Sequence, residues 1–134
     1  MATSILPMIL TPDIARLHWF YATLLGAKVV ERTPASGAAT FLGLRVGDAS
    51  FGLVAEPNVD LDAPQRMLLA IEVTDVAEVV SRVESAGGTL RGGPNDMPWG
   101  QRVAHVVDPD GNALNLIQPL AQPTPQPQSP PAQP

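Results

Sequence analysis

The stretch RVAHVVDPDGNALNLIQ, residues 102–118, places two apolar runs on either side of a short polar segment. That segment, Asp108-Pro109-Asp110-Gly111, is typical of a tight turn, because Asp, Pro and Gly each favour turn conformations. We therefore predict a hairpin of two strands, 102–107 and 113–118. The two carboxylates of the segment are interpreted as turn caps and not as a catalytic pair.

The closure of this hairpin decides which side chains share a face of the sheet. If the strands pair around Pro109-Asp110, His105 lies opposite Leu114 and Ala104 lies opposite Asn115. Cross-strand partners point to the same face, and successive residues alternate between faces. His105 is then expected on the face opposite to that of Asn115, unless a bulge in one strand reverses this arrangement.

A second hairpin is predicted in the first half of the chain. Residues 41–46 and 49–55 flank Gly47-Asp48, a good two-residue turn signal between apolar runs. Pairing around this turn sets three pairs opposite one another: Gly43 and Gly52, Phe41 and Val54, and Arg45 and Ser50.

Each hairpin follows a predicted amphipathic helix, and the two halves repeat at an offset of about 62 residues, as expected of a duplicated unit. Thr11-Pro12-Asp13-Ile14 precedes the first helical pattern and Val73-Thr74-Asp75-Val76 precedes the second. Thr11 and Thr74 are the expected N-caps, with Pro12 at the first helical position. Helix ends are expected at Gly26 and at Gly87-Gly88.

Four further strands are predicted around the helices, at residues 4–10, 28–32, 66–73 and 89–91. Each half then reads β-α-β-β-β. The predicted architecture is α+β: one domain over residues 1–118, made of modules at about 4–57 and 66–118 that form a curved mixed sheet. A helix that covers one face of a sheet leaves the other face free to curve around a ligand.

Composition excludes several classes of protein. The chain has 134 residues and a formal net charge of −5, which argues against a nucleic-acid-binding face. It has no cysteine, which excludes disulfides, thiolate metal sites and thiol nucleophiles. Its apolar runs are shorter than the ~18 residues of a membrane span, so no membrane is expected as a partner. The first residues lack a basic and then apolar signal pattern, so the expected compartment is the cytoplasm.

The end of the chain differs from the rest. Residues 119–134 hold seven of the fifteen prolines and no charged residue. We predict a disordered or polyproline-like tail, because there is almost nothing apolar to bury. The alternative is a PxxP ligand for a partner domain.

The order of elements, with PWGQR at 98–102 and DPDGN at 108–112, resembles the vicinal oxygen chelate superfamily, which contains glyoxalases, extradiol dioxygenases and bleomycin-resistance proteins. Phe20-Tyr21 followed by Leu24-Leu25-Gly26 in the first helix adds to the resemblance, which covers residues 4–118. It implies a cup built from the paired sheets and a homodimer with two equivalent pockets at or near the interface.

Enzymes of that superfamily hold a divalent metal through His, Gln or Glu on the first and last strands of each module. Counting from the shared landmarks puts these four positions at Leu6, Gly52, Leu68 and Asn115. Leucine and glycine offer no lone pair, and a metal normally needs three or four protein ligands. We therefore predict no metal, no other cofactor and no catalytic residue. A lone histidine makes no site either, and this applies to His18 and to His105.

With the chelating positions replaced, the cup is expected to be an apolar cavity with few polar anchors, as in small-molecule sites. The facing glycines Gly43 and Gly52 are expected to leave a flat slot for a planar ring, and Trp99 in the PWG loop is expected to stack on an aromatic ligand. The remaining predicted binding residues are the apolar Met8, Phe41 and Leu68, the rim cations Arg45 and Arg102, and the polar Asn115 and Glu72.

Three functions are compatible with these features. The first is a non-enzymatic protein that confers resistance by sequestering a bleomycin-like or other DNA-damaging antibiotic. The second is a metal-dependent lyase, isomerase or dioxygenase of the glyoxalase type, for which the metal ligands are missing. The third is a regulatory scaffold without a small ligand. The missing ligands and the apolar cup favour the first.

Overall fold

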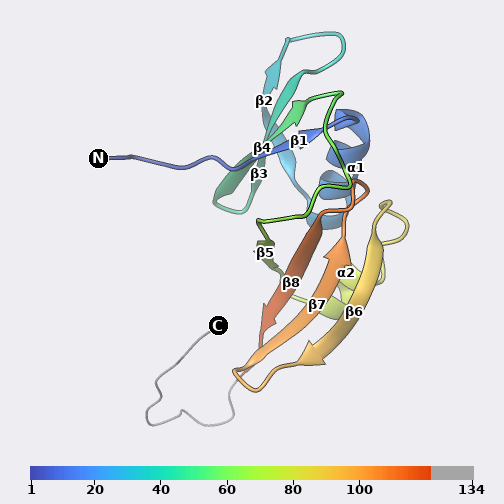
Figure 1. The fold of residues 1–134 in the computed structure, drawn as a ribbon. Helices are drawn as coiled ribbons and strands as arrows, with labels where there is room; N and C mark the ends of the chain where they lie inside the picture. Colours follow the sequence, from blue (N-terminus) through green and yellow to red (C-terminus); the bar gives the residue numbers. More distant parts are fainter. Residues whose placement is uncertain (122–134) are drawn as a thin grey trace.

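The computed structural model describes residues 1–121 as two four-stranded sheets with one helix on each (Figure 1). Sheet A has the strand order β1-β4-β3-β2, and sheet B has the order β5-β8-β7-β6. The elements of the first half are β1 (Met8–Thr11), α1 (Ile14–Leu25), β2 (Lys28–Thr33), β3 (Phe41–Val46) and β4 (Ala49–Ala55). Those of the second half are β5 (Leu69–Glu72), α2 (Val76–Val80), β6 (Thr89–Asp96), β7 (Gln101–Val107) and β8 (Ala113–Pro119). The predicted α+β fold of two β-α-β-β-β units is confirmed.

Helix α1 has its caps close to where the sequence suggests them. The N-cap is Asp13, whose side chain accepts a hydrogen bond from the Arg16 N–H at 3.0 Å. The predicted cap Thr11 is wrong: its hydroxyl accepts from the Asp13 N–H at 3.1 Å, and Pro12 lies outside the helix. An Asp at the junction supplies a stronger, charged cap than a Thr two residues earlier. Gly26 ends the helix as predicted, in the left-handed conformation with φ 70°.

Helix α2 is shorter than the periodic pattern predicts. It covers only Val76–Val80, and residues 81–87 continue as turns. Its N-cap is Asp75, which accepts from the Glu78 N–H at 3.2 Å, and not the predicted Thr74. Valine is β-branched and serine competes for backbone hydrogen bonds, so both lower the helix propensity of this segment. The apolar spacing therefore predicts which face is buried but not where the helix ends.

The core lies between each sheet and its helix. The largest fully buried side chains come from α1, from the central strands of both sheets and from the α2 region: Tyr21, Phe20, Leu17, Leu24, Leu44, Leu53, Leu114, Leu116, Val76, Val83 and Val106. The opposite face of each sheet is not covered by a helix, and we call it the open face.

Two predicted strands begin later than expected. Strand β1 begins at Met8 and not at residue 4, and β5 begins at Leu69 and not at residue 66. Each is an edge strand with a single parallel neighbour, β4 or β8, so its length is limited by that pairing. The chain before β1 projects away from sheet A (Figure 1). Strand β6 is longer than predicted because it continues through register shifts around Gly92.

The β7–β8 hairpin differs from the prediction by one residue in register. His105 pairs with Asn115 and Ala104 with Leu116, so the predicted pairs are wrong. The reason is that the turn contains five residues, 108–112. The Asp108 carboxylate accepts from the N–H groups of Asp110 and Asn112, each at 2.9 Å, and holds this longer turn. A shift of one residue moves every side chain to the other face.

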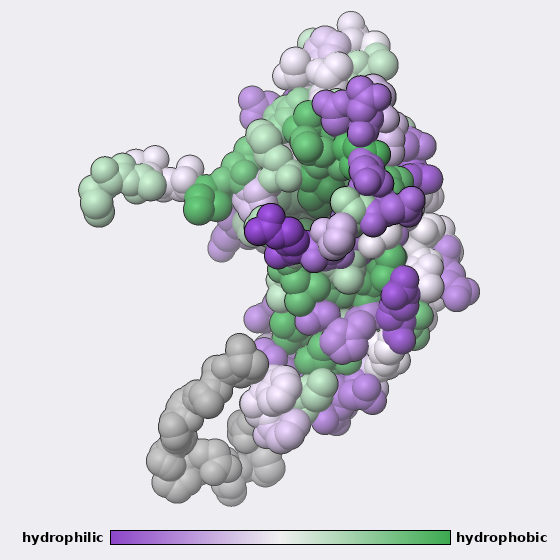
Figure 2. Space-filling view, viewed as in Figure 1, coloured by the Kyte–Doolittle hydropathy of each residue, from purple (hydrophilic) through white to green (hydrophobic). Residues whose placement is uncertain are grey.

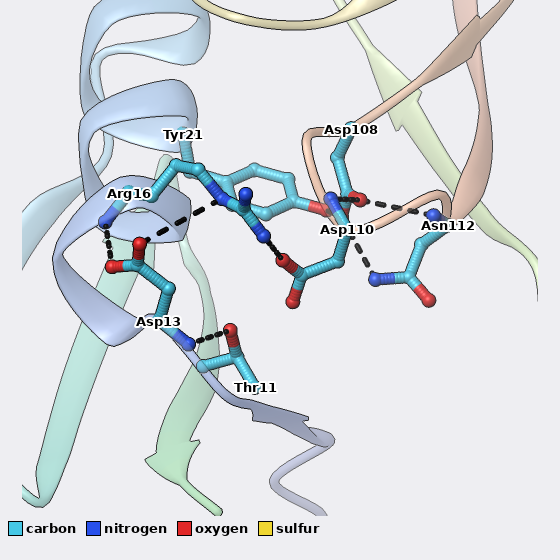
Figure 3. A network of polar contacts seen from close by, with 7 residues as sticks. All are labelled: Thr11, Asp13, Arg16, Tyr21, Asp108, Asp110 and Asn112. Carbon is cyan, nitrogen blue, oxygen red and sulfur yellow. Dashed lines mark hydrogen bonds and ion pairs between the residues drawn. The ribbon is translucent and has the colours of Figure 1, made fainter. Parts of the chain in front are cut away.

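The two modules are joined by polar contacts around α1 (Figure 3). The Tyr21 hydroxyl donates to Asp108 Oδ2 at 2.8 Å, and Arg16 Nη2 donates to Asp110 Oδ1 at 2.6 Å. Burial raises the pKa of Tyr21 far above its ordinary value, and the neighbouring carboxylate of Asp108 raises it further. Burial also raises the pKa of Asp108, against hydrogen bonds from Asn112 and Tyr21 that lower it.

The predicted tail lies outside the described residues from residue 122 onward. Its first two residues belong to the body, because Pro119 ends β8 and the Leu120 N–H donates to the Gly100 carbonyl at 2.9 Å. None of the helices in residues 1–121 is long and apolar enough to cross a membrane.

Candidate functional site

The open face of sheet A contains the predicted glycine pair. Gly43 and Gly52 lie opposite each other, as predicted, and the ring of Phe41 lies over both of them. A Cβ atom built on Gly52 would lie 2.8 Å from Phe41 Cε1, and one built on Gly43 would lie 3.6 Å from Phe41 Cζ. The prediction of an open slot is therefore wrong in one respect, because the protein's own ring fills it. The glycines instead make room on the sheet for the half-buried ring of Phe41.

Apolar side chains extend this surface to the edge of the sheet. Met8 pairs with Gly52 and Leu10 with Val54, and both side chains are about half exposed. At the other end of the face, Arg45 is exposed and pairs with Ser50, as predicted. We call Met8, Leu10, Phe41, Gly43 and Gly52 the apolar platform.

The open face of sheet B contains a polar pair. His105 Nδ1 lies 2.7 Å from Asn115 Oδ1, a contact that the predicted register did not allow. Asn115 also pairs with Ala70. Glu72 lies two residues further along β5, on the same face and opposite Ile117. The sequence therefore placed Asn115 and Glu72 on a shared face correctly but missed His105.

Trp99 and Arg102 do not join the apolar platform. Trp99 lies in the turn between β6 and β7, at the end of sheet B that points away from sheet A (Figure 1), and its Nε1 donates to Gln101 Oε1 at 2.8 Å. Arg102 shares a face with the buried Ala104, on the helix side of sheet B, so the prediction of a cation at the rim of the open face is wrong for Arg102. Its guanidinium lies 2.6 Å from Asp96, and this hydrogen bond holds the pKa of the Asp96 carboxyl below its usual range.

The four positions counted as metal-ligand equivalents do not form a donor set. Leu6 and Leu68 precede their strands and are exposed, and Gly52 has no side chain. Only Asn115 offers an oxygen, and that oxygen contacts His105. Within residues 1–121 there is no group of three or more His, Cys, Asp or Glu side chains that could hold a metal ion. The residues present therefore do not fit a divalent metal.

A cleft of about 630 Å³ lies beside β1, between the apolar platform and the segment that connects the modules. It is lined by Met8 and Leu10, by connecting-segment residues such as Leu61 and Met67, and by the turn at 110–113. Figure 2 shows apolar side chains gathered in a hollow on the half of the molecule that carries sheet A. Sequence reasoning missed this contribution, because the connecting segment has no periodicity to analyse.

One side chain attaches the connecting segment to sheet B. Gln65 Nε2 donates to the Ala113 carbonyl at 2.8 Å, and Gln65 Oε1 accepts from the Ala113 N–H at 2.6 Å. The side-chain amide thus makes the two hydrogen bonds with the start of β8 that a neighbouring strand would make. It holds the connecting segment, which lines the cleft, beside sheet B.

Comparison with known proteins agrees with this architecture. Residues 5–116 match the Glyoxalase/Bleomycin resistance protein/Dioxygenase superfamily. The chain belongs to this superfamily. The resemblance seen in the sequence is therefore confirmed, and the fold with it.

Relatives within the superfamily have different activities by name. A lactoylglutathione lyase of Neisseria meningitidis is 32% identical over 107 residues, covering 74% of this chain and 78% of the relative. CFP32 of Mycobacterium tuberculosis, a candidate glyoxylase by its description, is 28% identical over 83% of this chain, but the match spans only 41% of that longer protein.

Two similar solved structures carry names connected with antibiotics. The bleomycin resistance determinant encoded on transposon Tn5 aligns with a TM-score of 0.65 at 26% identity, covering 88% of this chain and 98% of that one. TnmS3, an antibiotic binding protein from Streptomyces, aligns with a TM-score of 0.62 at 28% identity, covering 89% and 98%.

Proposed function

We propose that this protein binds a planar aromatic small molecule, of the antibiotic class, without changing it chemically. The apolar platform carries the proposal. The Phe41 ring lies over Gly43 and Gly52, next to the exposed Met8, and an aromatic side chain on such a surface can stack on a planar ring. The adjoining cleft of about 630 Å³ is within the size range of small-molecule sites.

Two further observations support a binding role over catalysis. Three of the four positions used as metal ligands by superfamily enzymes carry Leu or Gly, so the chain lacks the donors that such chemistry needs. The Tn5 determinant and TnmS3, whose names refer to antibiotic resistance and binding, share the fold over nearly their whole length.

A second copy of the chain completes the proposed site. Along β1, the segment before it and the segment leading into β5, large apolar side chains are exposed: Ile5, Leu6, Met8, Leu10, Met67 and Leu68. These residues lie at the edge strands of both sheets, and exposed apolar edges favour association. We infer a homodimer in which the open face of one module covers that of the partner, with two equivalent sites.

The test is titration of the full chain with a panel of DNA-damaging antibiotics, bleomycin and planar aromatic compounds included. Tryptophan fluorescence and calorimetry are recorded with and without EDTA. We expect binding that EDTA does not change and that Phe41→Leu weakens about tenfold or more, since the substitution removes the stacking ring and keeps an apolar side chain. Trp19→Phe, on the exposed side of α1, is the matched control.

The outcomes separate the three hypotheses. Binding that EDTA abolishes would show that the assignment of residues 6, 52, 68 and 115 is wrong. If no compound binds, sequestration loses its support and the scaffold without a ligand gains it. If a compound binds and Phe41→Leu has no effect, the ligand lies away from the apolar platform.

A metal-dependent lyase is the second candidate, favoured by the 32% identity to the lactoylglutathione lyase. The residues present do not supply the metal ligands that such a lyase needs, so they support no metal-dependent catalytic step. Elemental analysis of protein purified without a chelator or a histidine tag tests this candidate. Stoichiometric zinc, nickel, manganese or iron would establish the lyase class over the binding protein.

A further inference from the structure

The His105–Asn115 pair has a defined direction. Asn115 Oδ1 is an amide carbonyl oxygen, which accepts hydrogen bonds and cannot donate them. With the Asn115 amide in this orientation, its 2.7 Å contact with His105 Nδ1 is a hydrogen bond that Nδ1 donates, so the proton is on Nδ1. An uncharged imidazole carries one N–H and one lone pair, so the lone pair is on Nε2. Within residues 1–121, Nε2 makes no hydrogen bond.

The surroundings leave this lone pair accessible. A row of paired residues, one from each strand of sheet B, contains Gly92, His105, Asn115 and Ala70 in that order. A Cβ atom on Gly92 would lie 3.7 Å from His105 Cδ2, so the imidazole lies beside a position that has no side chain. The side chain of His105 is exposed on the open face.

The next row of paired residues has the apolar Val103 and Ile117 at its centre, between Asn95 on β6 and Glu72 on β5. Binding sites commonly combine apolar side chains with a few polar groups that fix the orientation of a ligand. On this face His105 is an exposed polar group with a defined partner.

We propose that His105 Nε2 accepts a hydrogen bond from a hydroxyl group on the ring of the bound aromatic molecule, with Asn115 as the positioning residue that holds the imidazole in the required tautomer. The inference rests on the proposed function and specifies its ligand class: a hydroxylated planar aromatic, such as a phenol or naphthol. A ligand whose hydroxyl is methylated keeps the ring but cannot donate. It would leave the lone pair unpaired in the complex, which costs affinity.

The tautomer is tested first, without any ligand. The chain has two histidines, so nitrogen-15 NMR of the labelled full chain at pH 8.5 gives two imidazole patterns, which His18→Gln assigns. We expect His105 to be protonated at Nδ1. Asn115→Leu should shift it toward the Nε2–H form, whereas Asn115→Asp keeps an acceptor oxygen and should restore Nδ1–H. A wild-type His105 that is protonated at Nε2 would overturn the inference.

The ligand class is tested with a matched pair of probes, 2-naphthol and 2-methoxynaphthalene, which differ in the O–H donor. We expect wild type to prefer 2-naphthol by about tenfold. The preference should disappear in His105→Phe, which keeps a planar ring without a lone pair, and should persist in His18→Phe.

The outcomes distinguish the two levels of the proposal. Equal affinity of wild type for both probes would overturn the hydroxyl assignment and leave the proposed function standing. If neither probe binds, aromatic binding at the open faces fails, and the hydroxyl assignment fails with it.

Discussion

The hydroxyl of Tyr21, on the helix of the first module, donates a 2.8 Å hydrogen bond to Asp108 Oδ2, in the turn of the second. Both residues are buried. Asp108 also accepts from the N–H groups of Asp110 and Asn112 and from Asn112 Nδ2, so one carboxylate shapes the turn and joins the modules. The turn at residues 108–112, which the sequence predicts from its Asp, Pro and Gly residues, is therefore also a junction between the two modules.

Removing this hydroxyl should destabilise the protein without reshaping it. Tyr21→Phe keeps the ring, which contacts Phe20 and Phe51 edge-on, and leaves Asp108 with one donor fewer. We expect the free energy of unfolding to fall by about 1–3 kcal/mol, the cost of leaving a buried polar group unpaired. Urea denaturation measures it, with Trp19→Phe as the control. A change below about 0.5 kcal/mol would show that the module junction does not depend on this bond.

The same tyrosine predicts a loss of stability at alkaline pH. Burial raises its folded-state pKa far above 10, whereas in the unfolded chain the phenol ionises near its ordinary value of about 10. Above that pH the unfolded state loses a proton that the folded state keeps, so stability falls as pH rises, by about 1.4 kcal/mol per pH unit.

This chain makes the measurement simple because Tyr21 is its only tyrosine. Absorbance at 295 nm should report no tyrosinate at pH 11 until the protein unfolds. The unfolding free energy of Tyr21→Phe should lack the additional slope above pH 10. Tyrosinate formation in the folded protein near pH 10 would contradict the buried position of the hydroxyl.

The contact between Gly52 and the Phe41 ring predicts a coupled pair of substitutions. Gly52→Ala puts a Cβ atom 2.8 Å from Phe41 Cε1, so the ring must move. We expect Gly52→Ala to destabilise wild type but to be tolerated in a Phe41→Ala background, with a coupling of about 0.5–3 kcal/mol in a double-mutant cycle. Ser50→Ala, on the same strand, should show no coupling with Phe41→Ala. Additivity within about 0.5 kcal/mol would mean that the ring does not rest on Gly52.

Some of this site follows from the sequence, for an identifiable reason. The two-residue turn Gly47-Asp48 fixes the register of its hairpin, so the Gly43–Gly52 pair could be predicted correctly. In the other hairpin the Asp108 side chain holds a five-residue turn, and the sequence does not show which carboxylate caps which N–H group. That one-residue error concealed the contact between His105 and Asn115.

Other features depend on tertiary packing and have no local signal. The rotamer of Phe41 decides whether the space above Gly43 and Gly52 is empty or filled by the ring. Sequence spacing does not specify a rotamer. The cleft wall formed by residues 59–67 is held by the Gln65 amide, which in the sequence is an ordinary polar residue in a connecting segment.

The exposed apolar edge predicts the state of association. Light scattering at micromolar concentration should give twice the chain mass of 14.1 kDa. Leu68→Glu should shift the protein toward monomer, because it puts a charge into the proposed apolar contact while Leu68 is exposed in the single chain. Trp19→Glu, on α1, should leave the mass unchanged. A monomeric wild type, or a Leu68→Glu variant that remains dimeric, would count against the proposed arrangement.

Trp99 tests whether the site is shared between two copies. Its loop, between β6 and β7, lies at the end of sheet B that points away from sheet A (Figure 1), whereas the apolar platform lies on sheet A. If a second copy brings the open faces together, the half-exposed indole can anchor the ligand. Truncating a buried aromatic anchor commonly costs ~2 kcal/mol, about thirtyfold in affinity. Trp99→Ala should therefore weaken binding by about that factor, with the unfolding midpoint little changed.

The matched control is Trp19→Ala, because the chain has two tryptophans and Trp19 is exposed on α1. In the Trp19→Ala variant the remaining indole is Trp99, and its fluorescence should change on titration. In Trp99→Ala the remaining signal should stay nearly constant. If Trp99→Ala binds as tightly as wild type in a protein that light scattering shows to be dimeric, the ligand is held by the apolar platform and its cleft alone. The partner's sheet B would then contribute nothing to the site.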